Sequence, residues 1–272
     1  MSFPKSDDRE NQGGYWSEES FVKTVTGIKN MKVALMMLRG CELFPRSNDV
    51  VTFGVIDVWW IIHEGGLLLL LPYILSKNQV WGRNGAKLRI FVITTSSTEN
   101  PKKLSEAVSS HLTQARIAAA VTVVDMSHTS IGSDMRSGKD CDSYSKTVAE
   151  WFSKDSYEVP YVPLSGNSDI ELGYAEDTNE DFEFDETKSE TEGEETSNST
   201  SMSTDVEENK NIENAIEFNK ILKKYSSDSN LVVTNMPKLS PGFFNYVDAL
   251  CDGLDNVLLV KGSGKEVITT YA

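Results

Sequence analysis

One stretch of the chain, residues 56–73, constrains the fold more than any other. Its first part, residues 56–62, is rich in β-branched and aromatic residues, which suits a buried strand. Gly65 and Gly66 then supply a tight turn, and the leucines at 67–71, which lead into Pro72, suit a buried helix. The stretch therefore predicts a strand, a turn and a helix in direct succession.

An acidic residue and two tryptophans lie within this predicted strand. Alternation places Asp57 and Trp59 on one face and Val58 and Trp60 on the other, so each face of the sheet receives an indole. An unpaired carboxylate among these apolar neighbours would be costly, so Asp57 needs a partner. We expect Asp57, Trp59 and Trp60 to be structural rather than catalytic.

The formal net charge of −15 comes from one segment. Sixteen of the 41 acidic residues lie at 165–208, where Lys188 is the only base, and the rest of the chain carries 25 residues of each sign. The acidic segment repels nucleic acid, and no basic stripe elsewhere provides a binding surface for it. Nucleic acid is therefore not predicted as a partner.

The acidic segment is expected to be disordered, within an insertion assigned to residues 131–208. Ordering it would cost roughly 1–2 kcal/mol per residue, which its few apolar residues cannot offset. Ser189 and Thr191 lie beside acidic residues and are candidate sites for acid-directed kinases. A solvated insertion with no dedicated role is an equally weighted alternative.

Residue types that carry chemistry form no recognisable site. Cys41, Cys141 and Cys251 are far apart and lack the paired spacing of a zinc site, which fits a reducing compartment. The histidines belong to no metal spacing or nucleophile arrangement; we expect His63 at a turn and His111 on the exposed flank of a helix. Neither enzymatic activity, a metal nor a cofactor is predicted.

Gly262 and Gly264, near the end of the chain, are compatible with a phosphate loop, but a hairpin turn fits the sequence better. A phosphate loop is longer and opens a helix. Here Gly262-Ser263-Gly264 is followed by residues 266–271, which resemble a strand ending at Tyr271. The sequence predicts a terminal hairpin.

Strand-like and helical patterns alternate along the chain. The expected strands are residues 32–38, 55–62, 87–94, 119–124, 231–234, 256–260 and 266–271. Further helices are expected to begin at Asn100-Pro101 and at Ser240-Pro241, and another covers residues 215–222. This pattern predicts a layered α/β domain with a mostly parallel sheet and flanking helices. Its parts are an N-terminal segment with a helix (1–28), a first part (29–130), the insertion (131–208) and a second part (209–272).

Several motifs occur together and in order in a known family. The block at 56–72, with its Asp-Val-Trp-Trp sequence and its His-Glu-Gly-Gly turn, resembles the cytoplasmic carboxy-terminal domain of the cation–chloride cotransporters. Trp81, the Arg-Ile-Phe sequence at 89–91, the Asn-Met-Pro sequence that ends at Pro237 and the terminal segment ending near Tyr271 also resemble the family. His63, Asn-Met-Pro and Phe44-Pro45 resemble its potassium–chloride branch in particular.

The resemblance implies a function. It implies electroneutral symport of potassium and chloride, regulation of cell volume and chloride, and a domain that forms homodimers beneath the membrane transport domain of the same protein. It also implies regulatory kinases and a place on the cytoplasmic side of a membrane, expected to be the plasma membrane. The fold it implies is similar to that of the universal stress proteins.

The chain also departs from the family pattern. Its longest apolar run, residues 65–75, is about half of the ~20 residues that a bilayer span requires, so the chain is not expected to cross a membrane. The transport domain and the first half of the cytoplasmic domain are absent, so we expect a fragment or an internal Met1. The resemblance places the family's phosphorylated switch threonines near Met135 and at Asn214, where this chain has no threonine. Thr129, Thr147 or the acidic insertion could host a substitute.

Two functions therefore stay open. The first is a regulatory and dimerisation domain of a potassium–chloride cotransporter. The alternative is a nucleotide-binding module similar to the universal stress proteins, against which stands the lack of their glycine-framed phosphate loop in this sequence.

Overall fold

Six strands form one sheet, and five of them run in the same direction. The computed structural model describes residues 21, 23–27, 33–40, 44–46, 49, 51, 54–63, 66–81, 85–95, 100–130, 146–148, 152, 199–237, 239 and 242–263. The strand order is β1-β8-β7-β2-β4-β5. The strands are β1 (Leu35–Arg39), β2 (Val55–Trp60), β4 (Lys87–Thr94), β5 (Ala120–Asp125), β7 (Leu231–Asn235) and β8 (Val257–Lys261). In this sheet only β1 is antiparallel to its neighbour, so the predicted α/β class with a mostly parallel sheet is confirmed.

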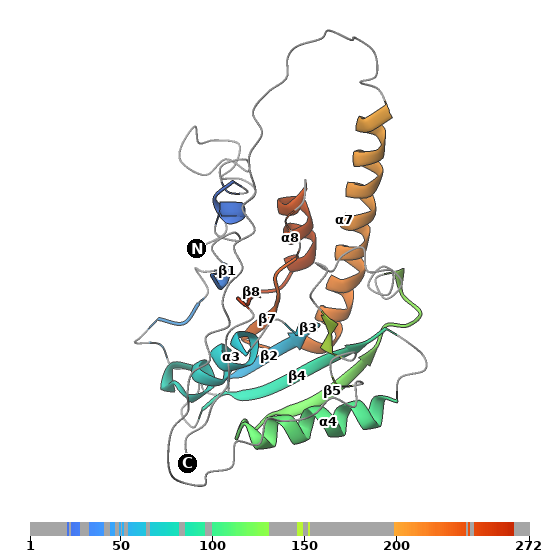
Figure 1. Cartoon of the computed structure of the whole chain (residues 1–272). Coiled ribbons are helices and arrows are strands. Elements are labelled where there is room, and N and C mark those ends of the chain that lie inside the picture. The colour runs from blue at the N-terminus through green and yellow to red at the C-terminus, as the bar shows by residue number, and fades with distance from the viewer. Residues whose placement is uncertain are drawn as a thin grey trace, which may run out of the picture.

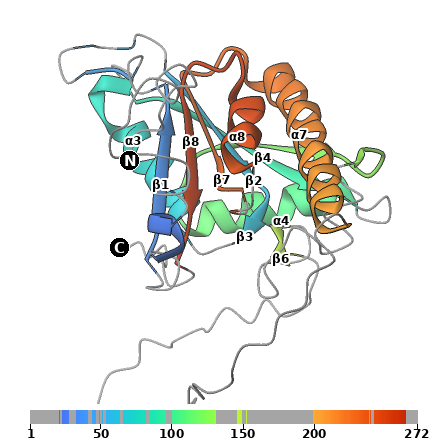
Figure 2. The same ribbon diagram turned by 90° about the horizontal axis from the view of Figure 1, so that it is seen from above.

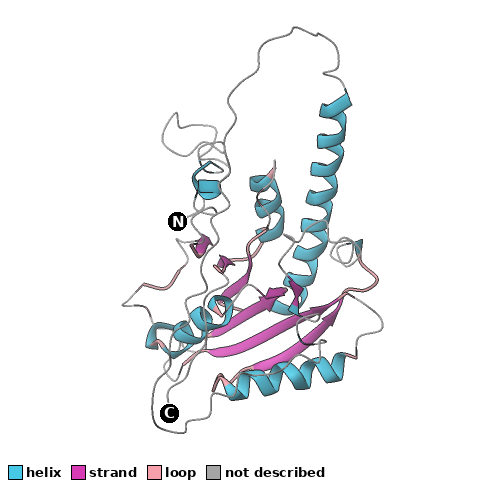
Figure 3. Cartoon of the chain, viewed as in Figure 1, coloured by secondary structure: helices cyan, strands magenta, loops and turns pink. Residues whose placement is uncertain are grey.

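Helices cover both faces of the sheet, as Figures 1 and 2 show. One face packs against α3 (Leu67–Lys77), the short 3-10 helix η2 (Gln79–Trp81) and α4 (Pro101–Gln114). The other face packs against α7 (Ser199–Ser226), α8 (Phe243–Cys251) and helical residues at 21–27. In Figure 3 the strands lie between these helices. The apolar character of the strands follows, because both of their faces are buried.

Helix α4 begins where the sequence predicts. The Asn100 side chain accepts hydrogen bonds from the backbone N–H groups of Lys102 and Lys103, at 3.0 and 3.4 Å, and Pro101 occupies the first turn. Three residues of its apolar stripe are buried against the sheet: Leu104, Val108 and Leu112.

The leucine-rich helix α3 also matches its prediction. It starts directly after Gly66, whose φ of −82° is an ordinary value that does not require glycine. Leu68 and Leu69 are buried, and Pro72 is buried within the helix. Proline has no backbone N–H, so the hydrogen bond that position 72 would donate along the helix is missing.

Parts of the range 131–208, expected to be disordered, form regular structure. Strand β3 (Ile62–His63) pairs in antiparallel fashion with β6 (Lys146–Thr147), and Val148 is fully buried. Helix α7 already begins at Ser199. Once its packed part has formed, each further residue is added at little cost, because propagation is easier than nucleation. The insertion prediction is therefore wrong for residues 146–148 and 199–208.

The predicted terminal hairpin lies mostly outside the described residues, but the structure shows both neighbours of its first strand. Strand β8 pairs with β7 on one side and with β1 on the other. Gly262 directly follows β8 and is half-buried, whereas Gly264 and Tyr271 lie outside the described residues. The sequence did not reveal that the edge of β8 is taken by β1, because that contact joins distant parts of the chain.

Candidate functional site

Arg89 is the partner that Asp57 requires. In the parallel pair of β2 and β4, Asp57 lies directly opposite Arg89. The guanidinium donates from Nε to Asp57 Oδ1 at 2.6 Å and from Nη2 to Oδ2 at 2.7 Å. Asp57 is completely buried, and two parallel N–H···O bonds of this kind are among the strongest hydrogen bonds that a carboxylate accepts.

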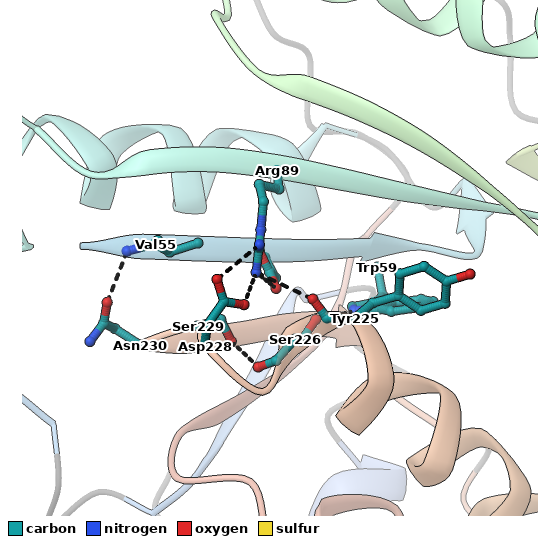
Figure 4. Close-up of polar contacts among 9 residues, drawn as sticks. Val55, Trp59, Arg89, Tyr225, Ser226, Asp228, Ser229 and Asn230 are labelled. Carbon is teal, nitrogen blue, oxygen red and sulfur yellow. Dashed lines mark hydrogen bonds and ion pairs between the residues drawn. The ribbon is translucent and has the colours of Figure 1, made fainter. Parts of the chain in front are cut away.

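The same guanidinium joins the sheet to the turn after α7 (Figure 4). Arg89 donates two hydrogen bonds to Asp228, at 2.7 and 3.2 Å, and one to the carbonyl of Tyr225 at 3.4 Å. Two residues after Asp228, Asn230 Oδ1 accepts from the backbone N–H of Val55 at 2.9 Å. We call Asp57, Arg89, Tyr225 and Asp228 the Arg89 cluster; it connects β2, β4 and the end of α7.

The electrostatics of the Arg89 cluster favour a structural role. Burial raises the pKa of Asp57, and the hydrogen bonds from Arg89 oppose that shift. The bonds to Asp57 raise the pKa of Arg89, and the bonds from Arg89 lower the pKa of Asp228. The cluster lies near the amino ends of β2 and β4, whereas open α/β sheets bind ligands beyond the carboxyl ends of their strands. It is suited to holding elements together.

The two tryptophans point to opposite faces of the sheet, as alternation predicts. Trp59 stacks on Phe91 with ring centroids 4.7 Å apart, and its Nε1 donates to Ser226 Oγ at 3.0 Å. Trp60 belongs to the core under α3 and α4. Both indoles are completely buried.

A ring cluster surrounds Trp60 where β2 ends. The rings of His63, Phe152 and His111 have centroids 5.6, 5.9 and 6.2 Å from that of Trp60. Burial lowers the pKa of His63 to about 4, helped by the neighbouring His111, and burial also lowers the pKa of His111. His111 is half-buried rather than fully exposed, because its ring lies beside those of Trp60 and Phe152. We call these four residues the Trp60 cluster.

The carboxyl edge between β2 and β7 is where the strand order reverses, the place where α/β sheets commonly bind ligands. Here Asn235 Oδ1 accepts from the backbone N–H of Ile61 at 3.0 Å, and Val148 N–H donates to the carbonyl of Ile61 at 3.0 Å. Met236 N–H donates to the carbonyl of Val260, and half-buried Pro237 follows. The backbone groups of Ile61 are thus engaged by the chain itself.

Other candidate chemistry is also accounted for within the described residues. No group of His, Cys, Asp and Glu side chains there is arranged to hold a metal ion. Cys251 is buried and its pKa is raised to about 12, so its thiol is protonated. Gly65, Ser189 and Thr191 lie outside the described part of the chain, so their predicted roles stay predictions.

Sequence reasoning did not identify Arg89 as the partner of Asp57. A partial signal was present, because Asp57 and Arg89 are each the third residue of their strands, and β2 and β4 start level with each other in the sheet. Phe152 was missed because it lies in a polar stretch and gains its contacts only from the folded chain.

Comparison with known proteins decides the family. A family model described as Solute carrier family 12 matches residues 17–272. The chain belongs to solute carrier family 12. This membership confirms the resemblance to the cation–chloride cotransporters and places the chain in a family of transporters rather than enzymes.

A relative within this family supports the potassium–chloride branch. The chain is 25% identical over 266 residues to potassium/chloride cotransporter 3 of Caenorhabditis elegans, a match that covers 86% of this chain and 24% of that protein. The solute carrier chain thus spans about a quarter of its relative. In the part that the structure describes, no helix is both long enough and apolar enough to cross a bilayer.

Proposed function

We propose that this solute carrier family 12 chain is the cytoplasmic regulatory and dimerisation domain of an electroneutral potassium–chloride symporter. The supporting observation is a family match over residues 17–272 that coincides with an α/β sheet flanked by helices. Ions cross a bilayer through structures whose backbone groups are all satisfied within lipid, and those belong to the membrane transport domain of the same protein. This chain then acts on that domain from the cytoplasmic side.

A domain of this kind changes transport only if it contacts two transport states differently. The Arg89 cluster supplies the rigidity for such an effect, because it fixes the end of α7 to β2 and β4. Loss of the cluster would loosen α7 against the sheet. Transport should then slow without a change in the ions carried.

The test uses the full-length cotransporter with Arg89→Met in this domain. Lys103→Met is the matched control, because it removes a positive charge from the exposed side of α4. Chloride-dependent rubidium uptake per surface molecule should fall for Arg89→Met and stay unchanged for Lys103→Met. Unchanged uptake for Arg89→Met would refute the regulatory role, and an altered cation preference would refute the division of labour between the two domains.

Dimerisation and nucleotide binding need separate measurements on the purified chain. Light scattering should give twice the monomer mass, and a monomer at micromolar concentration would count against the dimerisation role. Calorimetry with ATP should give no heat of binding, because the backbone groups of Ile61 at the carboxyl edge are already engaged by Asn235 and Val148. Measurable binding would favour the alternative nucleotide-binding module.

The proposal includes regulatory kinases that act on the acidic segment. Ser189 and Thr191 are the candidate acceptors, since each has acidic neighbours. Mass spectrometry after treatment with an acid-directed kinase should find phosphate on at least one of them. The variant with both residues changed to alanine is the control.

A further inference from the structure

The outer edge of β1 is built like an edge that another strand covers. Among the described strands β1 has one neighbour, β8. Residues 33–38 are all apolar, and Val33 and Met36 expose 54% and 43% of their surface. Proteins protect open sheet edges with charges, proline or bulges, because an open apolar edge invites pairing with other chains. Residues 33–38 contain neither a charge nor a proline, and Arg39, the charged residue that ends β1, is paired with Asp248 at 2.9 Å.

The end of the chain holds a segment that suits this edge. Residues 266–271, Glu-Val-Ile-Thr-Thr-Tyr, are rich in the β-branched and aromatic types that favour strands. They cannot pair with β8, since β7 and β1 occupy both of its sides. We propose that residues 266–271 cover the outer edge of β1 in the same chain, as a seventh strand. This inference does not depend on the proposed function.

The connection from Lys261 to Glu266 can reach the outer side of β1 but not the outer side of β5, at the other edge of the sheet. Lys261, the last residue of β8, lies opposite Leu35, the first of β1. The outer side of β1 is two strand spacings from β8, about 10 Å. Five residue steps from 261 to 266 reach about 16–18 Å. The outer side of β5 is five spacings away, about 24 Å.

The direction of the new strand also follows. The chain leaves β8 beside the start of β1, so a segment that turns back runs parallel to β1. The tether keeps the segment at an effective concentration on the order of millimolar, well above that of a second copy in solution. The segment therefore prevents edge-to-edge pairing of two copies through β1. A dimer of this domain must then use another surface.

Amide hydrogen exchange tests the pairing in the full chain. The chain that ends at Ser263 should exchange the outward-facing amides of residues 35–38 at least about tenfold faster than the full chain. Val267→Pro or Ile268→Pro should also speed up exchange of these amides, because proline removes a backbone donor from the added strand. Ile268→Ala keeps that donor and is the matched control. Equal exchange of these amides in the full and shortened chains would overturn the proposal.

Cysteine cross-linking distinguishes this chain's own segment from a second copy. Met36→Cys is combined in turn with Val267→Cys, Ile268→Cys and Thr269→Cys, in a background in which Cys41 and Cys141 are replaced by serine. Mild oxidation should give a disulfide within one chain for at least one of the three pairs. Disulfide-linked dimers alone, or no disulfide for any pair, would refute the proposal.

Discussion

Asp57 and Arg89 lie directly opposite each other in neighbouring parallel strands, and two hydrogen bonds of 2.6 and 2.7 Å join their side chains. Asp57 is completely buried, while the side chain of Arg89 keeps 20% of its surface exposed. Arg89 therefore pairs with a buried carboxylate and also reaches the surface, where it pairs with Asp228.

Arg89→Met should strongly destabilise the domain. It leaves Asp57 buried without its charged partner, which typically costs about 3–5 kcal/mol. Asp228→Asn is the control, because Asp228 has 64% of its side chain exposed and its loss should cost no more than about 1 kcal/mol. The free energy of unfolding from urea melts measures both. Similar losses for the two variants would show that Asp57 does not depend on Arg89.

Trp60→Ala should also be costly, at about 3–5 kcal/mol, because it opens a cavity in a buried core. Ile74→Ala provides the comparison, since Ile74 is 55% exposed on α3 and its truncation should change stability by only about 0.5 kcal/mol. Urea melts again give the values. A loss under about 1 kcal/mol for Trp60→Ala would contradict the packing around it.

The Trp60 cluster makes stability depend on pH. The pKa of His63 is about 4 in the folded chain, below the ordinary value of 6.5. Between these values the unfolded chain binds a proton that the folded chain does not, so stability present above pH 6.5 is lost as the pH falls toward 4. His111 contributes in the same direction.

The matching variant is His63→Phe, which keeps a ring beside Trp60 and removes the titrating group. The wild type should lose more stability than this variant between about pH 6.5 and about pH 4.5. Thermal or urea melts at both pH values provide the comparison. Equal losses would show that folding does not lower the pKa of His63.

Deletion of residues 165–198 should leave the fold intact. The deletion removes 13 acidic residues and one lysine. The shorter loop changes the entropy of loop closure only weakly. A deletion that continues to Glu208 also removes the start of α7 and a 3.3 Å contact of Glu208 with Asn245, so it should be less stable. Urea melts of both forms decide the point; equal stability would show that the start of α7 contributes nothing.

The sequence was sufficient where a local pattern determines the structure. Strand β4 has the predicted limits, residues 87–94, because alternation at its start leads into the β-branched and aromatic run at 90–93. Helix α4 begins as predicted because Asn100 and Pro101 act on neighbouring residues. The opposite faces of Trp59 and Trp60 follow from strand alternation alone.

Contacts between distant segments were not predictable in the same way. The pairing of Asp57 with Arg89 depends on the register of two strands, and the partial burial of His111 depends on Phe152 from the insertion. The position of β1 beside β8 joins opposite ends of the chain. In each case the determining neighbour lies more than 30 residues away, where no local pattern reports it.

The central strand β2 pairs with β4 from one side of the insertion and with β7 from the other. During synthesis β7 therefore emerges about 100 residues after β5, roughly 5–20 s later at ribosomal rates. In that interval α3 and α4 can already cover the Trp60 face, while the Trp59 face still waits for α7 and α8. The nascent chain thus exposes apolar residues on the Trp59 face of the sheet while the Trp60 face is covered. Molecular chaperones that bind exposed aromatic surface would therefore bind the Trp59 face only.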